Sequence, residues 1–265
     1  MRNRSIKIAA VALALSLSGC GMLPEKVDET RTWSASKLYS EARDELASGN
    51  YERAIQHFEK LESRYPFGTY AQQAQMEIAY AHYRQGEQPE ALAAVERFIK
   101  LHPNHPNVDY MYYLRGLINF NDRLGFLSFL SRQDPSERDP KAARDAFDSF
   151  KLLAERFPDS PYTKDAVARL KYLVNAMAQY EVHVAKYYYR RGAYVAAANR
   201  AQIAVSEYRE APAVEEALYV MAQSYDAMGM TKLRDDTNRV LRQNFPNSAY
   251  FSGGPQVNKP WWQIW

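Results

Sequence analysis

Along residues 33–120 and 140–248, apolar and polar positions alternate with the period of an α-helix. Apolar residues recur at spacings of three and four on both sides of glycine-containing turns, and prolines end most of the second segments. This spacing places the apolar side chains on one face of each helix. A proline that follows such a segment marks its end. The pattern therefore predicts pairs of amphipathic helices.

The predicted helix pairs repeat along the chain. In residues 48–66, Gly49 is followed by Ala54, Phe58 and Leu61 and then by Tyr65–Pro66. Similar offsets recur later, once without the glycine. Seven residues before each glycine or its equivalent stands a small residue, at intervals of 37, 37, 69 and 37 residues. These small residues are Ala42, Ala79, Gly116, Ala185 and Ala222.

The single long interval is accounted for by two insertions into one repeat plan, one of 18 residues after Gly116 and one of 14 in the first helix of the fourth unit. The plan is that of the tetratricopeptide repeat (TPR) in a stretched form. One such unit cannot bury its apolar face alone, so neighbouring units stack. We predict an all-α fold, a right-handed solenoid of five TPR-like helix pairs with a concave groove.

This plan divides the chain into six segments. They are a cleaved signal peptide (1–19), a lipidated linker (20–32), repeats 1–2 with the first helix of repeat 3 (33–120), an insertion (121–139), the C-terminal repeats (140–248) and a Trp-rich tail (249–265).

The N-terminal segment resembles the signal of a bacterial lipoprotein. A basic stretch precedes twelve uncharged residues, which are too few to span a bilayer, and the small residues Ser18 and Gly19 precede Cys20, the only cysteine. In lipoproteins such a cysteine carries the lipid. The alternative is a buried apolar cysteine. We expect a covalent lipid on Cys20 and no other cofactor. In the lipoprotein sorting rule of enteric bacteria, an Asp directly after the lipidated cysteine favours the inner membrane. Residue 21 is Gly, so we expect the periplasmic face of the outer membrane.

Removal of the signal changes the charge. The full chain has 34 Lys and Arg against 31 Asp and Glu, and three of the cations lie in the signal, which leaves the mature chain neutral in these side chains. A nucleic-acid-binding domain shows clustered excess Lys and Arg. We therefore expect no nucleic-acid partner.

The sequence carries no motif of a familiar catalytic site, neither GxSxG, HExxH nor a glycine-rich phosphate loop. His102 and His105 have a spacing that suits two metal ligands, but no third ligand accompanies them. We expect a protein that is not an enzyme and has no metal site.

The first helix of each pair offers a candidate binding stripe. Positions −3, +1 and +4 from the small residue share one helix face, which TPR proteins generally turn toward the groove. In the first three units these positions are Tyr39, Arg43, Leu46, Met76, Tyr80, Tyr83, Tyr113, Leu117 and Phe120. Aromatic and thioether side chains with one cation suit an extended peptide that carries aromatic side chains and a carboxylate. The alternative is that several of them pack between repeats.

Two apolar segments fall outside the repeat plan. The insertion contains Phe126, Leu127, Phe129 and Leu130, which either fold back on the solenoid or contact a partner. The tail contains Trp261, Trp262 and Trp265, which either dock on the last repeat or meet a membrane or another protein.

Five segments resemble a known family. They are RYPFGTYAQQAQ (64–75), HPNVDYMYYLRGL (105–117), RDPKAARDAF (138–147), YTKDAVARL (162–170) and AKYYYRRGAYVAAANR (185–200). They are similar to the signature segments of the BamD (ComL) family, lipoproteins of the β-barrel assembly (BAM) machinery of the bacterial outer membrane. The resemblance covers residues 17–246 and leaves out the Trp-rich tail.

The resemblance implies a scaffold that assists the folding and insertion of β-barrel proteins. Its N-terminal repeats would bind the C-terminal aromatic signal of unfolded barrel proteins, with Arg43 as a candidate carboxylate partner. Its C-terminal repeats would bind the POTRA domains of BamA and other BAM lipoproteins, with Arg190, Arg191 and Arg200 as candidate contacts. A peptidoglycan-associated lipoprotein with a cell-wall role is the alternative.

Overall fold

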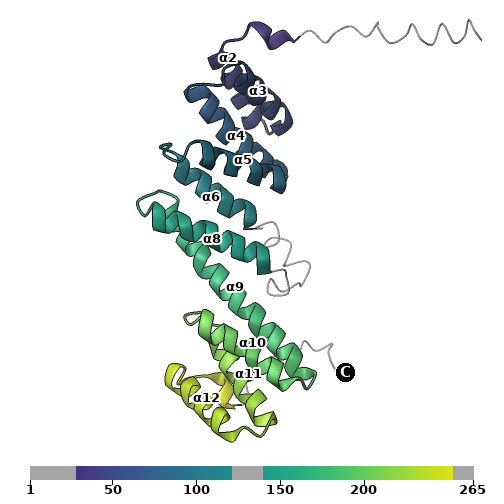
Figure 1. Cartoon of the computed structure of the whole chain (residues 1–265), viewed down its shortest axis with the longest axis vertical. Coiled ribbons are helices and arrows are strands. Elements are labelled where there is room, and N and C mark those ends of the chain that lie inside the picture. The colour runs from purple at the N-terminus through teal and green to yellow at the C-terminus, as the bar shows by residue number, and fades with distance from the viewer. Residues whose placement is uncertain (1–27, 121–139, 253–265) are drawn as a thin grey trace, which may run out of the picture.

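The computed structural model describes residues 28–120 and 140–252, and the described part of the chain is a rod of stacked helix pairs (Figure 1). Ten α-helices lie in these residues, together with two short 3₁₀ helices, η2 (Glu29–Thr32) and η4 (Ala249–Ser252). The α-helices are α2 (Ala35–Ala47), α3 (Tyr51–Arg64), α4 (Thr69–Gln85), α5 (Gln88–Leu101), α6 (Val108–Asn119), α8 (Pro140–Arg156), α9 (Thr163–Arg190), α10 (Tyr194–Glu207), α11 (Val214–Ala227) and α12 (Thr231–Asn244).

Each helix packs mainly against its neighbours in the chain, which gives the five predicted pairs α2/α3, α4/α5, α6/α8, α9/α10 and α11/α12. The all-α solenoid is thus confirmed. The predictions for Cys20, for residues 121–139 and for Trp261, Trp262 and Trp265 lie outside the described residues. In the described part of the chain, no helix combines the length and the apolar character that crossing a membrane requires.

The turns inside the pairs depend on glycine. Gly49, Gly86, Gly192 and Gly229 all have left-handed backbone angles, with φ of 82°, 82°, 75° and 69°. Other residues rarely adopt this conformation because their Cβ clashes with the backbone. The glycines that defined the repeat are therefore the residues that reverse the chain.

The small residues lie where the two helices of a pair touch. Ala42, Ala79 and Ala185 are fully buried. At Gly116 of α6, a Cβ atom would collide with the ring of Phe150 on α8. The small residue thus sets how closely the helices approach, as the repeat pattern predicts.

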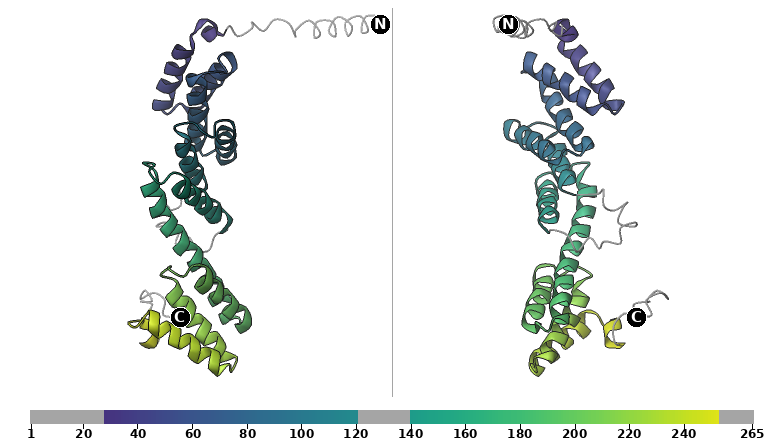
Figure 2. Two further views of the ribbon diagram at one scale, coloured as in Figure 1. Left: turned by 60° about the vertical axis from the view of Figure 1, so that its left-hand side comes forward. Right: turned by 90° about the vertical axis from the view of Figure 1, so that its right-hand side faces the viewer.

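The long helix α9 joins the two halves of the rod (Figure 2). Its N-terminal half contributes Leu173 and Met177 to the core beneath α8, and its C-terminal half contributes Val182 and Ala185 to the core beneath α10 and α11. The 14 extra residues predicted in the fourth unit are therefore an extension of this helix.

Candidate peptide-binding groove

A groove of about 610 Å³ lies across the first two repeats and the start of the third, within the usual size of a ligand pocket. Its walls come from α2, the start of α3, α4, the start of α6 and the residue that precedes α9. The lining residues are Arg43, Leu46, Ala47, Tyr51, Met76, Glu77, Tyr80, Arg84, Asn107, Tyr110 and Tyr162.

The structure brings three of the six predicted groove residues, Arg43, Met76 and Tyr80, to one surface. The three other predicted residues lie beside the groove lining. Tyr39 packs against Phe58 and Tyr70, with ring centroids 5.8 and 5.4 Å away.

Tyr83 is half-buried against the core between α4, α5 and α6. Tyr113 is not among the groove-lining residues, but its ring stacks on that of Tyr162, with centroids 4.9 Å apart. The alternative of packing between repeats therefore applies to Tyr39, Tyr83 and Tyr113, each of which packs against a core cluster, and Tyr80 packs against two of these clusters.

Arg43 of α2 forms an ion pair with Glu77 of α4 across the groove. The Arg43 side chain is 51% exposed, whereas that of Glu77 is 18% exposed. Glu77 raises the pKa of Arg43 above its ordinary value through charge attraction. A ligand carboxylate at Arg43 must therefore compete with Glu77.

A second guanidinium enters the groove from α4. Arg84 donates a hydrogen bond to the hydroxyl of Tyr80 at 2.6 Å, and it lies 5.3 Å from the ring centroid of Tyr51 and 5.6 Å from that of Tyr80. Cations are attracted to aromatic faces at such distances. Arg84 lies outside the positions −3, +1 and +4 that define the predicted stripe. Its place one helical turn after Tyr80 puts it on the same helix face, and this spacing could have predicted it.

Tyrosines form the far wall of the groove. The ring centroids of Tyr110 and Tyr162 lie 5.5 Å apart, and the Tyr162 ring stacks in turn on the Tyr113 ring. The Tyr113 hydroxyl donates to Asp165 at 2.7 Å, and burial together with this bond raises the pKa of Tyr113 to about 12. Burial also raises the pKa of Tyr110. Tyr110 and Tyr113 therefore stay neutral, and Tyr110 and Tyr162 line the groove with aromatic rings.

The loop that carries Tyr162 is fixed by a hydrogen bond from Ser160 to Asp109 at 2.6 Å. Asp109 lies in the first turn of α6, next to Tyr110. The third repeat therefore closes the groove through two elements that are far apart in the sequence. Tyr162 stands in a loop just before α9, outside the helical stripe, so helical periodicity does not predict it.

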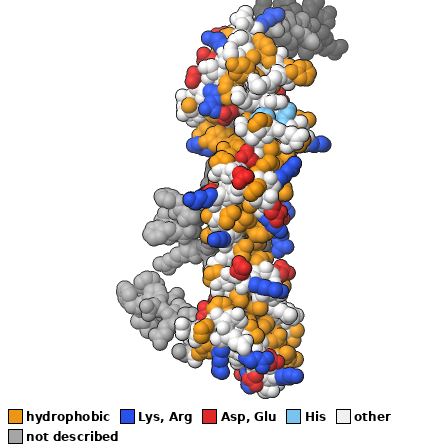
Figure 3. All heavy atoms as spheres, turned by 90° about the vertical axis from the view of Figure 1, so that its left-hand side faces the viewer, with side chains coloured by type: hydrophobic (Ala, Val, Ile, Leu, Met, Phe, Trp, Pro, Cys, Tyr) orange, Lys and Arg blue, Asp and Glu red, His pale blue; other side chains and the backbone are white. Residues whose placement is uncertain are grey.

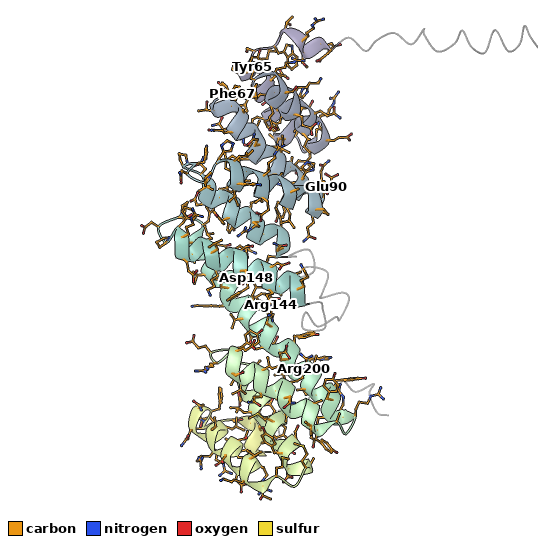
Figure 4. All side chains as sticks on the ribbon, in the orientation of Figure 1. Tyr65, Phe67, Glu90, Arg144, Asp148 and Arg200 are labelled. Carbon is orange, nitrogen blue, oxygen red and sulfur yellow. The ribbon has the colours of Figure 1, made fainter. Side chains whose placement is uncertain are left out.

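The three arginines proposed for a partner surface do not form one cluster. Arg190 and Arg191 are exposed at the end of α9, where Arg191 lies 5.4 Å from the ring centroid of Tyr187. Arg200 of α10, labelled in Figure 4, is paired with Glu181 at 3.0 Å. Glu181 lies nine residues before Arg190, about 14 Å along the helix. Arg190 and Arg191 are thus the accessible pair.

The histidines at the α5–α6 turn have partners other than a metal. A ring nitrogen of His102 lies 3.0 Å from the side-chain oxygen of Gln75, and His105 accepts a hydrogen bond from the backbone of Asn107. Within residues 28–120 and 140–252, no group of three or more His, Cys, Asp or Glu residues has the arrangement of a metal site.

Charge is spread along the rod. Figure 3 shows hydrophobic side chains interspersed with both positive and negative ones over the face it presents. A stack of helix pairs with an aromatic groove defines a TPR-like repeat protein, a class whose concave surfaces commonly serve as binding surfaces.

Comparison with known proteins gives the family. A family model described as outer membrane lipoprotein (YfiO) matches residues 31–241. The outer membrane protein assembly factor BamD of Neisseria meningitidis serogroup A is 47% identical over 262 residues, which cover 97% of this chain and 98% of the relative.

The same factor from Vibrio cholerae is 38% identical, covering 88% of this chain and 95% of the relative. That from Haemophilus influenzae is 33% identical, covering 91% of each. The chain therefore belongs to the BamD family of outer membrane lipoproteins.

Proposed function

We propose that this protein is a non-catalytic assembly factor for outer-membrane β-barrel proteins, and that the groove of the first three repeats binds the C-terminal aromatic segment of an unfolded client. Membership of the BamD family supports the assembly role. The observation that supports the binding role is the groove itself, in which Tyr51, Tyr80 and Tyr110 line the same surface as the guanidinium groups of Arg43 and Arg84.

The chemistry of the groove suits such a segment. Tyrosine faces and Met76 accept aromatic side chains. A terminal carboxylate is recognised by a guanidinium through two parallel hydrogen bonds, and Arg43 and Arg84 both line the groove. The open walls allow an extended chain to lie along the solenoid, which is how repeat proteins commonly bind peptides.

Two further parts of the proposal concern placement. Cys20 carries the lipid that holds the protein at the periplasmic face of the outer membrane. The exposed end of α9, with Arg190, Arg191 and Tyr187, binds the POTRA domains of BamA or another BAM lipoprotein. Tyr and Arg are the residues that most often dominate protein interfaces. Arg200, which is paired with Glu181, lies apart from this surface and is not part of the proposed contact.

The test is a binding assay with the purified protein and a urea-denatured β-barrel protein that is diluted into buffer. The control is the same barrel protein without its last ten residues or so, the length of one membrane-spanning strand. We expect the full client to bind and the truncated client to bind much more weakly. Equal binding of the two clients would refute the proposed role of the groove.

A further inference from the structure

The turn between α3 and α4 carries aromatic side chains that the protein core does not use. Phe67 is 91% exposed, and Tyr65 and Tyr70 beside it are 38% and 39% exposed. The next residue, Gly68, has a φ of 98°. Figure 4 shows Tyr65 and Phe67 at the end of the rod that carries the N-terminal repeat. The Phe67 ring is therefore almost free of contacts with residues 28–120 and 140–252.

The start of the described chain is fastened to this same end. Asp28 accepts a hydrogen bond from Lys60 at 3.1 Å and forms an ion pair with Arg64. The Tyr65 hydroxyl donates to the backbone oxygen of Trp33 at 3.0 Å. The chain is therefore held against the end of α3, directly beside the aromatic turn, from Asp28 onward.

This fastening limits how far the turn can lie from Cys20. Asp28 is the eighth residue after Cys20, and eight residue-to-residue steps span at most about 29 Å in any conformation. The inference rests on the proposed lipid on Cys20. With that lipid in a bilayer, Asp28 lies within about 29 Å of the anchor, and the aromatic turn at Tyr65–Tyr70 beside it is within reach of the bilayer surface.

We propose that the aromatic turn is a second membrane contact, in which Phe67 enters the interfacial region of the lipid bilayer and the flanking tyrosines lie at the headgroup level. Aromatic side chains with one polar end are enriched at this depth. A lipid anchor that is joined by a second weak contact holds a protein more firmly than either alone, and the short tether gives this contact a high local concentration.

A bilayer fits this surface better than a protein partner does. A stable protein interface takes about 800 Å² from each partner, and the turn presents one projecting ring with two half-exposed neighbours instead of a broad face or a groove. A tethered protein needs only a small additional contact with the surface to which it is already attached. The contact would also keep the N-terminal end of the rod at the membrane.

The test uses the full chain with Phe67→Cys labelled with an environment-sensitive fluorophore. A lipidated Cys20 leaves the introduced cysteine as the single thiol. The protein is placed in vesicles of phosphatidylethanolamine and phosphatidylglycerol, with and without brominated acyl chains as quenchers. Val195→Cys is the matched control, because Val195 is 62% exposed at the start of α10 in the other half of the rod.

We expect the label at residue 67 to be quenched by the brominated lipids about twofold or more and the label at residue 195 to be unaffected. Equal fluorescence with and without brominated lipid at residue 67 would overturn the proposal. A label at residue 67 that is shielded from aqueous iodide but not quenched by lipid would also overturn it and would indicate a contact with the protein itself or with a second copy.

A second arm separates this inference from the lipid anchor. Cys20→Ser with a histidine tag in place of residues 1–19 is tethered to nickel-chelating lipids in the same vesicles. If residue 67 is quenched in the nickel-tethered variant but not in the protein with its own N-terminus, the result supports the membrane contact and rejects the lipid on Cys20 as the anchor. If the labelled protein with its own N-terminus stays on the vesicles and residue 67 is not quenched, the result rejects the membrane contact and supports the lipid anchor.

Discussion

Arg43 of α2 forms an ion pair with Glu77 of α4, and this pair joins the first repeat to the second across the proposed binding groove. Glu77 is the less exposed of the two side chains. It occupies the position that a ligand carboxylate would take at Arg43. The pair therefore makes Glu77 a competitor for the proposed client.

Glu77→Gln should raise the affinity for a peptide that ends in an aromatic residue with a free carboxylate, by about two- to fivefold, because the competing charge is removed. The affinity for the same peptide with an amidated end should not change. Fluorescence anisotropy with both peptides measures this difference. Glu41→Gln is the control, because Glu41 belongs to a separate surface ion pair with Lys37. An equal gain for both peptides would contradict a role for Arg43.

Tyr80→Ala should weaken binding of the aromatic peptide by about five- to thirtyfold, the effect of removing an interface hot spot. Tyr80 lines the groove and positions Arg84 through its hydroxyl. Titration calorimetry measures the loss. Tyr187→Ala, an exposed tyrosine of α9, is the matched control and should bind normally.

Tyr83→Phe should leave peptide affinity unchanged, although Tyr83 lies only one turn from Tyr80. Its ring packs against the core between α4, α5 and α6, which the phenylalanine ring preserves. If Tyr83→Phe loses as much affinity as Tyr80→Ala, then Tyr83 contacts the peptide, as the sequence predicts. The assignment of Tyr83 to the core would then be wrong.

The repeat architecture was predictable because it depends on local signals. The glycines at positive φ and the buried small residues recur at fixed offsets, and each reports a constraint within one helix pair. Only part of the groove was predictable. Tyr51 and Tyr162 reach it from a second helix and a loop, and the Arg43–Glu77 pair depends on the register between repeats. No periodicity within one helix determines these contacts between neighbouring units.

Gly116→Ala should lower the free energy of unfolding by about 1 to 3 kcal/mol, because the added methyl group overlaps the ring of Phe150. Guanidinium unfolding followed by circular dichroism measures the loss. In a protein that already carries Phe150→Leu, Gly116→Ala should cost less free energy of unfolding than it costs in the wild type, since the smaller side chain makes room. Fully additive effects would contradict the close approach of α6 and α8.

The attachment of η2 should weaken in acid. The hydrogen bond from Thr30, with a further contribution from Lys60, lowers the pKa of Asp28 from 3.8 to about 2. A carboxylate with a lowered pKa in the folded state stabilises that state above its unfolded pKa. The contribution is therefore present above about pH 4 and disappears as the pH falls toward 2.

Hydrogen exchange of residues 29–33 in the wild type and in Asp28→Asn measures this effect. The wild type should be better protected at pH 6, and the two proteins should become alike near pH 2. Glu29→Gln serves as the control for the loss of a neighbouring carboxylate. An undiminished difference between wild type and Asp28→Asn at pH 2 would show that the protection does not depend on the charge of Asp28.

The most direct test of the central claim is site-specific photocrosslinking in the full, membrane-attached protein during assembly of an outer-membrane β-barrel protein. A photoreactive amino acid replaces Ala47, which lines the groove, or Val195, which lies in the other half of the rod. The proposed function predicts that position 47 crosslinks to the last strand of the unfolded client and that position 195 does not. Client crosslinks of equal yield at both positions, or none at position 47, would contradict it.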